Sequence, residues 1–348
     1  MKINKKSLLA VDLGYSNVKV CYYDEAGALQ FDKYISSVSK VETPIQLDDD
    51  IMFELGGTTY VMGASALKLS STLLMPLETF EDMKQIYPIW LSYLLKKYGG
   101  RDKFKHVIVG LSMAFSDRAD ELLKYLYDTL LIQEENFFIV LTQGLAASYA
   151  INTRSLDISE TSSGHSGSNG PKNYILLDGG FLTCDFCSCI AGRASAGAAI
   201  GVPNTGCIVI AYNIIDYLFK EFQMRISIKE AQNILDNDGI FVKRGRKYDI
   251  SDKVKQFTKN YIGNVLELLE EKYGTYLDSS DKLLVVGGIS YLFQKYENDP
   301  DVTKEIEKHF TKSFIQWPTD LGEYYNCYSY LKAAEEKILP SVYGESES

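Results

Sequence analysis

Two stretches of the sequence share one pattern and decide the fold: LLAVDLGYSNVKVCYY at residues 8–23 and YILLDGGFLTCDFCSC at residues 174–189. They lie 166 positions apart, so that Asp12 matches Asp178. Each consists of an apolar run, a tight Asp-x-Gly turn and a second, alternating run, which is typical of a β-hairpin. A hairpin repeated at this distance predicts two related halves, each beginning a sheet with helices around it.

The remaining pattern is that of an α/β protein. We expect helices at 82–98, 117–131, from 142, at 204–222, from 227, at 252–272 and at 323–338, and further strands at 53–55, 58–62, 107–111, 137–141, 281–286 and 314–316. Asn204 is expected to cap the helix that begins there, and Ser227 and Glu230 have the spacing of a capping box. Strands separated by helical stretches predict α/β architecture. Residues 155–172 are dominated by Ser, Gly, Thr and Asn and are predicted to be a mobile loop.

Composition excludes several classes of protein. The chain has 348 residues, and 36 Lys and Arg against 46 Asp and Glu give a net charge of −10. Such a charge repels phosphate backbones, so we expect no direct binding to nucleic acid. No stretch has the length and apolarity of a signal peptide or a membrane span, and six cysteines in a chain of this length favour a reduced, cytoplasmic protein.

The turns of the two hairpins have the chemistry of a phosphate site. A glycine at a tight turn lets backbone N–H groups approach phosphate oxygens, because no side chain blocks them. The aspartate beside each turn supplies charge for a divalent cation. We therefore predict that the two turns hold the β- and γ-phosphates of one nucleotide, with Mg²⁺ bound through water by Asp12 and Asp178.

Four motifs resemble those of the superfamily that contains actin, the sugar kinases and the DnaK-type chaperones, and they occur in the family's order. They are D-x-G-x-S-N-x-K at 12–19, T-Q-G-L-A-A-S-Y at 142–149, D-G-G-x-x-T-x-D at 178–185 and V-V-G-G-I at 285–289. Within the superfamily, the ending S-N-x-K, the T-x-D and the short chain are most similar to the ParM/StbA plasmid-segregation actins. The resemblance covers roughly residues 8–337.

The resemblance implies a duplicated, ribonuclease-H-like actin fold with two lobes and a nucleotide cleft between them. The first lobe is expected at 1–154 plus 321–348, with a small subdomain at about 30–82, and the second at 173–320, with a helical subdomain at about 206–275. It also implies an ATPase that binds ATP or GTP with Mg²⁺ and polymerises into filaments. The expected partners are other copies of the chain and a DNA-bound adaptor of the ParR type.

Site residues follow from the matched motifs. Phosphate and adenosine contacts are expected from Gly14, Tyr15, Ser16, Asn17, Lys19, Gly179, Gly180, Phe181, Thr183, Gly287, Gly288 and Ile289. The catalytic residues are Gln143, whose amide would orient the attacking water rather than deprotonate it, and Asp178. Tyr15 and Phe181 stand where relatives usually have small residues, so only their backbone amides would contact phosphate. The ribose contact is expected from the helix around 227–235.

Several other features are open to a simpler interpretation. Cys184 and Cys187 point to opposite faces of their strand, so Cys184, Cys187 and Cys189 form a poor metal site and are expected to pack in the core. The basic turn Lys243–Lys247 is either a solvated hairpin, a filament or partner contact, or a nucleic-acid contact. None of the three histidines is assigned a catalytic role.

Three other functions compete with the filament-forming ATPase. A small-molecule kinase of the same superfamily would use Asp185 as its base, but the chain lacks the length that such kinases devote to sugar recognition. A chaperone is disfavoured, because nothing after residue 340 could form a peptide-binding domain. A structural filament without hydrolysis is the third alternative.

Overall fold

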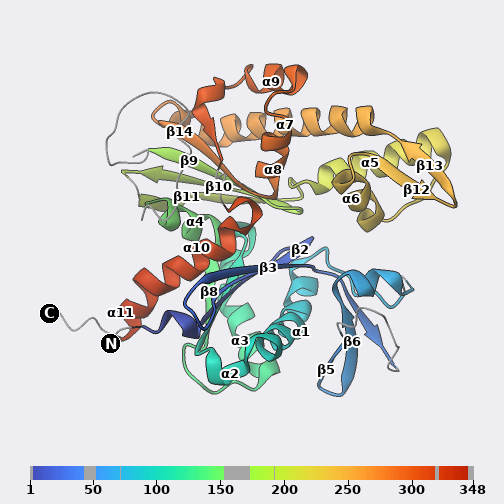
Figure 1. Ribbon diagram of the computed structural model, residues 1–348. Helices are drawn as coiled ribbons and strands as arrows, with labels where there is room; N and C mark the ends of the chain where they lie inside the picture. The colour runs from blue at the N-terminus through green and yellow to red at the C-terminus, as the bar shows by residue number, and fades with distance from the viewer. Residues whose placement is uncertain are drawn as a thin grey trace. The chain divides into compact units, whose positions relative to one another are not determined.

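The computed structural model describes residues 3–42, 52–70, 72–152, 173–191, 193–317 and 321–343. The chain divides into two compact units (Figure 1). Unit 1 comprises Met1–Ser155 and Tyr324–Ser348, and unit 2 comprises Leu156–Glu323. The loop predicted at 155–172 lies outside the described residues.

The sheet of unit 1 begins with the first predicted hairpin. Its strand order is β3-β2-β1-β7-β8, with bounds β1 Leu8–Leu13, β2 Asn17–Tyr23, β3 Leu29–Ile35, β7 His106–Leu111 and β8 Phe138–Thr142. Strand β2 runs antiparallel to its two neighbours β1 and β3, while β7 is parallel to β1 and β8 is parallel to β7. In this register Asp12 lies directly opposite Lys19.

Alternation along the strands sends their side chains to two different layers. Leu9 and Val11 belong to the core that also contains residues of helices α1 (Phe80–Tyr98) and α3 (Ala119–Leu130). The opposite face, which carries Asp12, contacts helix α10 (Tyr325–Ala333), and α10 also packs on α4 (Gln143–Asn152) (Figure 1). Asp12 is therefore held between a sheet and two helices.

Residues 29–35 were expected in the small peripheral subdomain, but they form β3 of the main sheet. Their register with β2 is continuous from Asn17↔Ile35 to Tyr23↔Leu29, so the hairpin extends into a three-stranded meander. The peripheral part is a separate sheet in the order β4-β6-β5, with bounds β4 Val38–Val41, β5 Met52–Leu55 and β6 Thr58–Met62.

The sheet of unit 2 repeats this plan. Its order is β11-β10-β9-β14-β15, with bounds β9 Tyr174–Gly179, β10 Thr183–Ile190, β11 Arg193–Pro203, β14 Lys282–Gly287 and β15 Ile315–Gln316. Three antiparallel strands are again followed by two parallel ones. Helices α5 (Ile208–Phe222), α6 (Ile228–Asp236) and α7 (Ser251–Leu277) share a core with one face of the sheet.

The duplication extends to single hydrogen bonds. The Gly14 N–H donates to the Asn17 carbonyl at 3.0 Å, and the Gly180 N–H donates to the Thr183 carbonyl at 2.9 Å. These pairs lie at matching positions of the two repeats. The duplicated α/β fold predicted from the sequence is therefore confirmed.

In unit 2 one strand was not predicted, and one expected helix start was wrong. Strand β11 was not predicted, because its sequence RASAGAAIGVP is rich in Ala and Gly, which are poor strand formers. Asn204 was expected to cap a helix, but the helix begins at Ile208 after Cys207, and Asn204 has a left-handed φ of 60° in the turn before it. The capping box predicted at Ser227 and Glu230 is present at the start of α6.

The remaining elements connect these layers. They are α2 Gly100–Lys103, β12 Ile240–Lys243, β13 Arg246–Asp249, α8 Gly288–Lys295, α9 Pro300–Ile306, a π-helical stretch Ala334–Ile338 and α11 Leu339–Tyr343, with short 3₁₀ turns at Lys5–Ser7, Gly63–Lys68, Met113–Arg118, Lys312–Phe314 and Gly322–Tyr324. No helix in the described ranges is both long and apolar enough to span a membrane.

The six cysteines are free and buried, so the core packing predicted for Cys184, Cys187 and Cys189 is confirmed. Burial raises the pKa of both the Cys184 and Cys207 thiols to about 12, so that neither is a reactive thiolate near neutral pH. Within the described part of the chain, no three metal-ligating side chains form a group.

Candidate nucleotide site

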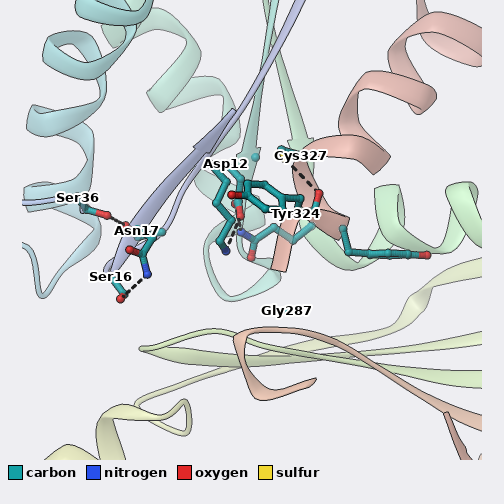
Figure 2. Close-up of polar contacts among 12 residues, drawn as sticks. Asp12, Ser16, Asn17, Ser36, Gly287, Tyr324 and Cys327 are labelled. Atoms are coloured by element: carbon teal, nitrogen blue, oxygen red, sulfur yellow. Dashed lines mark hydrogen bonds and ion pairs between the residues drawn. The ribbon is translucent and has the colours of Figure 1, made fainter. Parts of the chain in front are cut away.

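The first hairpin turn is fixed by its neighbours as well as by its own hydrogen bonds (Figure 2). The Ser36 hydroxyl donates to the Gly14 carbonyl at 2.5 Å, and the Ser36 N–H donates to the Ser16 carbonyl at 3.0 Å. The Asn17 amide donates to the Ser16 hydroxyl at 2.9 Å. A Cβ at Gly14 would lie 3.1 Å from the Asn17 carbonyl oxygen, so the tight turn favours glycine here.

Asp12 is the centre of the polar contacts in unit 1. It is 2% exposed, and Lys19 Nζ lies 3.3 Å from its Oδ2. The Gln143 amide donates to Oδ1 at 3.1 Å, from the first residue of α4. The structure therefore brings together three residues that the sequence predicted as site residues, and they come from β1, β2 and α4.

Tyr330 is a contact of Asp12 that the sequence patterns did not predict. Its hydroxyl donates to Asp12 Oδ1 at 3.3 Å from helix α10, more than 300 positions along the chain. Its ring lies over Gly110 of β7, where a Cβ would come within 2.2 Å of the ring. The glycine after the apolar run Val107–Val109 was the only sequence signal of this contact, because the absence of a side chain there leaves room for the ring.

We expect Tyr330→Phe to weaken the hold on Asp12 without changing its charge. Loss of this hydrogen bond should lower the free energy of unfolding by about 1 kcal/mol and the affinity for Mg-nucleotide severalfold. Denaturant unfolding and calorimetry measure the two effects. Tyr325→Phe is the matched control: Tyr325 is equally buried in the same helix, but its hydroxyl donates to the Ala147 carbonyl at 2.9 Å. An equal loss of nucleotide affinity in the control would contradict the positioning role.

The side chain of Tyr15 packs against the core of unit 1. Its hydroxyl is buried and has no hydrogen-bond partner among the described residues, and burial raises its pKa well above the usual value. This agrees with the expectation that only the backbone of Tyr15 is available to a phosphate.

The second turn is held by the start of helix α5. The carbonyls of Gly180, Phe181 and Leu182 accept hydrogen bonds from the N–H groups of Cys207, Ile208 and Gly206, at 3.1, 2.7 and 3.1 Å. A Cβ at Gly206 would lie 2.5 Å from the Phe181 carbonyl oxygen, so Gly206 is needed for this close approach. No sequence motif had singled out Gly206.

Asp178 lies beside the glycines predicted to contact adenosine. It is 3% exposed, and a Cβ at Gly287 would lie 2.3 Å from its Oδ1. Gly287 has a φ of 73°, and Ile289 covers Gly179, where a Cβ would meet its side chain at 2.4 Å. Asp185, 1% exposed, is the register partner of Asp178, at the position that Lys19 occupies in unit 1.

Helix α6 carries a partly buried lysine, Lys229. The ribose contact was expected from this helix. Lys229 donates to Gln232 Oε1 at 2.9 Å, and burial lowers its pKa. Glu230, the N3 residue of the capping box, pairs with Lys243. Gln232 is buried and Lys229 is half-buried, and we take these two side chains of α6 as candidates for the ribose contact.

The donor set within each unit fits a cation held through water. The first hairpin provides the buried carboxylate of Asp12 beside its glycine turn, and the second provides those of Asp178 and Asp185. Mg²⁺ characteristically keeps several water ligands and uses one or two carboxylates together with phosphate oxygens. Asp12 also has three donors that fix its orientation, which is how an outer-shell carboxylate is held in place.

Solved structures similar to this chain share one architecture. A ParM filament from Clostridium botulinum matches with a TM-score of 0.68 at 16% identity, covering 96% of this chain and 100% of that one. The fold is that of the actin-like proteins. The archaeal actin homolog Ta0583 in complex with ADP matches with a TM-score of 0.66 at 15% identity, covering 95% and 100% of the two chains.

A third match is ParM from Bacillus thuringiensis with AMPPNP, with a TM-score of 0.56, 15% identity and coverage of 97% and 100%. The actin-like fold expected from the four motifs is therefore confirmed over almost the whole chain. No protein-family model and no curated protein sequence matches the chain.

Proposed function

We propose that this protein is an actin-like ATPase that assembles into filaments with bound ATP and disassembles after hydrolysis. The observation that carries the proposal is the pair of matching glycine hairpins, each with a buried aspartate at its base, on an actin-like fold. Similar structures contain ADP or AMPPNP, and one is a filament, which supports both nucleotide binding and assembly.

Both hairpins contact the phosphates in this proposal. Gly14, Tyr15 and Ser16 in one turn and Gly180 and Phe181 in the other offer backbone amides to the phosphates of the same nucleotide. Further contacts come from Asn17, Lys19, Gly179, Thr183, Gly287, Gly288 and Ile289. GTP is the alternative nucleotide.

Asp12 and Asp178 would hold Mg²⁺ through water, and the cation would neutralise charge on the phosphate oxygens. Gln143 orients the attacking water, because a neutral amide can donate and accept but has no basic character near pH 7. Hydrolysis without a strong base is slow, so filaments persist long enough to do work. Segregation of plasmid DNA through a ParR-type adaptor in the cytoplasm is the cellular role that we propose.

Light scattering and sedimentation with Mg-ATP, together with phosphate release, test this function. We expect scattering to rise, and then to decay as phosphate appears. Absence of pelletable species at tens of micromolar protein with every nucleotide would refute assembly. Persistent filaments without phosphate release would identify a structural filament instead.

Gln143→Ala separates hydrolysis from binding. We expect ATP to bind with severalfold lower affinity, because Asp12 loses one of its donors, and filaments to form at saturating ATP, while phosphate release slows by roughly 10²-fold because the water loses its orientation. Scattering should then stay at its plateau. Gln133→Ala, at an exposed position after α3, is the control, and its scattering should decay as that of the wild type does. Unchanged phosphate release in Gln143→Ala would show that this amide does not orient the water.

A small-molecule kinase is the second candidate, and the placement of Asp185 favours it. This carboxylate is buried opposite Asp178, close to where a base would be needed. Transfer of the γ-phosphate of ATP to a sugar hydroxyl, abolished in Asp185→Asn, would establish the kinase and overturn the filament ATPase.

A further inference from the structure

A basic hairpin projects from one end of the long helix of unit 2. Strands β12 and β13 pair directly before α7 begins at Ser251, and their turn contains Lys243, Arg244, Gly245, Arg246 and Lys247 (Figure 1). Arg244 and Gly245 both have left-handed φ values, 51° and 76°, which is the signature of a tight two-residue turn. This geometry presents the arginines on a rigid tip.

Three of the four cations of this tip are exposed and available. Lys243 pairs with Glu230, but Arg244, Arg246 and Lys247 are exposed and make no ion pair with any described residue. On a chain with a net charge of −10, such a cluster is a local exception. Solvation by water explains why single cations stand on a surface, but it does not explain the apolar surface beside these three cations.

The hairpin has one packed face and one apolar face that is open to solvent. On the packed face, Phe241 and Tyr248 stack on each other at 5.1 Å, and Tyr248 also packs edge-on against Phe222 of α5. Strand alternation places Ile240 and Val242 on the outer face, where Val242 is 69% exposed. The projecting hairpin therefore combines cations with an uncovered apolar patch, the composition of an interface rather than of a solvated loop.

A cavity with the opposite character lies at the other end of α7. Its volume is about 500 Å³, and its walls include Glu270, Leu277, Asp278, His309, Phe310 and Phe314. Phe310 and Phe314 stack at 5.2 Å, which gives the cavity an aromatic wall. Asp278 is exposed and makes no ion pair within the described ranges.

The polar groups of this cavity suit a donor-rich cation. His309 Nδ1 lies 3.0 Å from Glu270 Oε2, and its Nε2 is buried without a hydrogen-bond partner among the described residues. In the tautomer that carries its proton on Nδ1, the ring donates to the Glu270 carboxylate and leaves Nε2 as an acceptor. Two carboxylates, an unfilled acceptor and stacked aromatic rings together favour a guanidinium, which donates in a plane and stacks on rings.

We propose that the basic hairpin of one copy of this chain binds in the acidic cavity of the next copy. The inference rests on the proposed filament and names the contact that builds it. Helix α7 has 27 residues and is about 40 Å long, so it holds the projecting and receiving surfaces far apart and at opposite ends. A contact between two different surfaces of identical copies is head-to-tail and propagates as an open chain.

Charge reversal on each surface tests the contact. The hairpin variant is Arg244→Glu with Arg246→Glu, and the pocket variant is Glu270→Lys with Asp278→Lys. Each alone should raise the critical concentration for assembly by at least roughly tenfold, because like charges then meet in a desolvated contact. Thermal unfolding and nucleotide affinity, measured on each variant, show that the chain is folded and loaded.

The two variants mixed in equal amounts supply the decisive result. The reversed hairpin of one then meets the reversed pocket of the other, and the native surfaces meet in turn, so assembly should return to near the wild-type concentration. Wild-type-like assembly of either variant alone, or failure of the folded and nucleotide-bound mixture to assemble, would overturn the contact.

Two further outcomes distinguish this contact from a nucleic-acid site and from a chain that does not polymerise. Loss of double-stranded DNA binding in a hairpin variant that still assembles normally would assign the tip to nucleic acid and overturn the proposal. A wild-type protein that binds nucleotide but never assembles would refute the filament itself and this contact with it.

Discussion

Asp12→Asn is expected to lower the affinity for Mg-ATP by 10–100-fold, and Asp178→Asn to do the same. Asparagine keeps an oxygen that accepts from Gln143 and from Tyr330, so the substitution at position 12 removes the charge and leaves these two contacts. The cation then loses an anionic partner for its water ligands. Calorimetry with Mg-ATP or Mg-ADP measures the loss.

The same titration in EDTA determines whether the loss is electrostatic. Without the cation, the carboxylate of Asp12 repels the phosphates, so Asp12→Asn should bind metal-free ADP as tightly as the wild type or more tightly. Asp216→Asn, in an exposed pair with Lys220 on α5, is the control and should change neither affinity. Equal losses with and without Mg²⁺ would mean that Asp12 has only a structural role.

Gly287→Ala is expected to destabilise unit 2 by roughly 3 kcal/mol, the second large effect. The backbone at Gly287 has φ 73° and ψ −164°, a region that essentially only glycine adopts. A Cβ would also lie 2.3 Å from Asp178 Oδ1 and 2.8 Å from the Gly179 carbonyl oxygen, and the backbone oxygen cannot move away without disturbing β9. Denaturant unfolding measures the change.

The neighbouring glycine provides the control. Gly288 begins α8 with helical backbone, and a Cβ there would have its nearest contact at 3.5 Å, which is ordinary packing distance. Gly288→Ala should therefore leave the stability unchanged or raise it by up to about 1 kcal/mol, because alanine favours the helix. If the two substitutions cost the same, the strained backbone and the close approach are not what requires glycine at 287.

The sequence patterns predicted the helices and strands whose formation depends on residues close together in the chain. The apolar runs on either side of Asp12 and Asp178 predicted both hairpins, and Ser227 with Glu230 predicted the start of α6. Strand β11 escaped prediction because its Ala and Gly residues have little strand preference of their own. Pairing with β10 from Thr183↔Pro203 onward makes it a strand, and that is a contact between distant positions.

The sequence by itself determined the duplicated plan, the two Asp-Gly turns and the candidate site residues of the first hairpin. Each of these depends on periodicity and turn chemistry within some sixteen positions. Only the tertiary structure decided that Tyr330 reaches Asp12 across Gly110, that Gly206 closes on the Phe181 carbonyl, and that a basic tip and an acidic cavity terminate the two ends of α7. Packing of distant segments makes these contacts, and no local pattern encodes which segments meet.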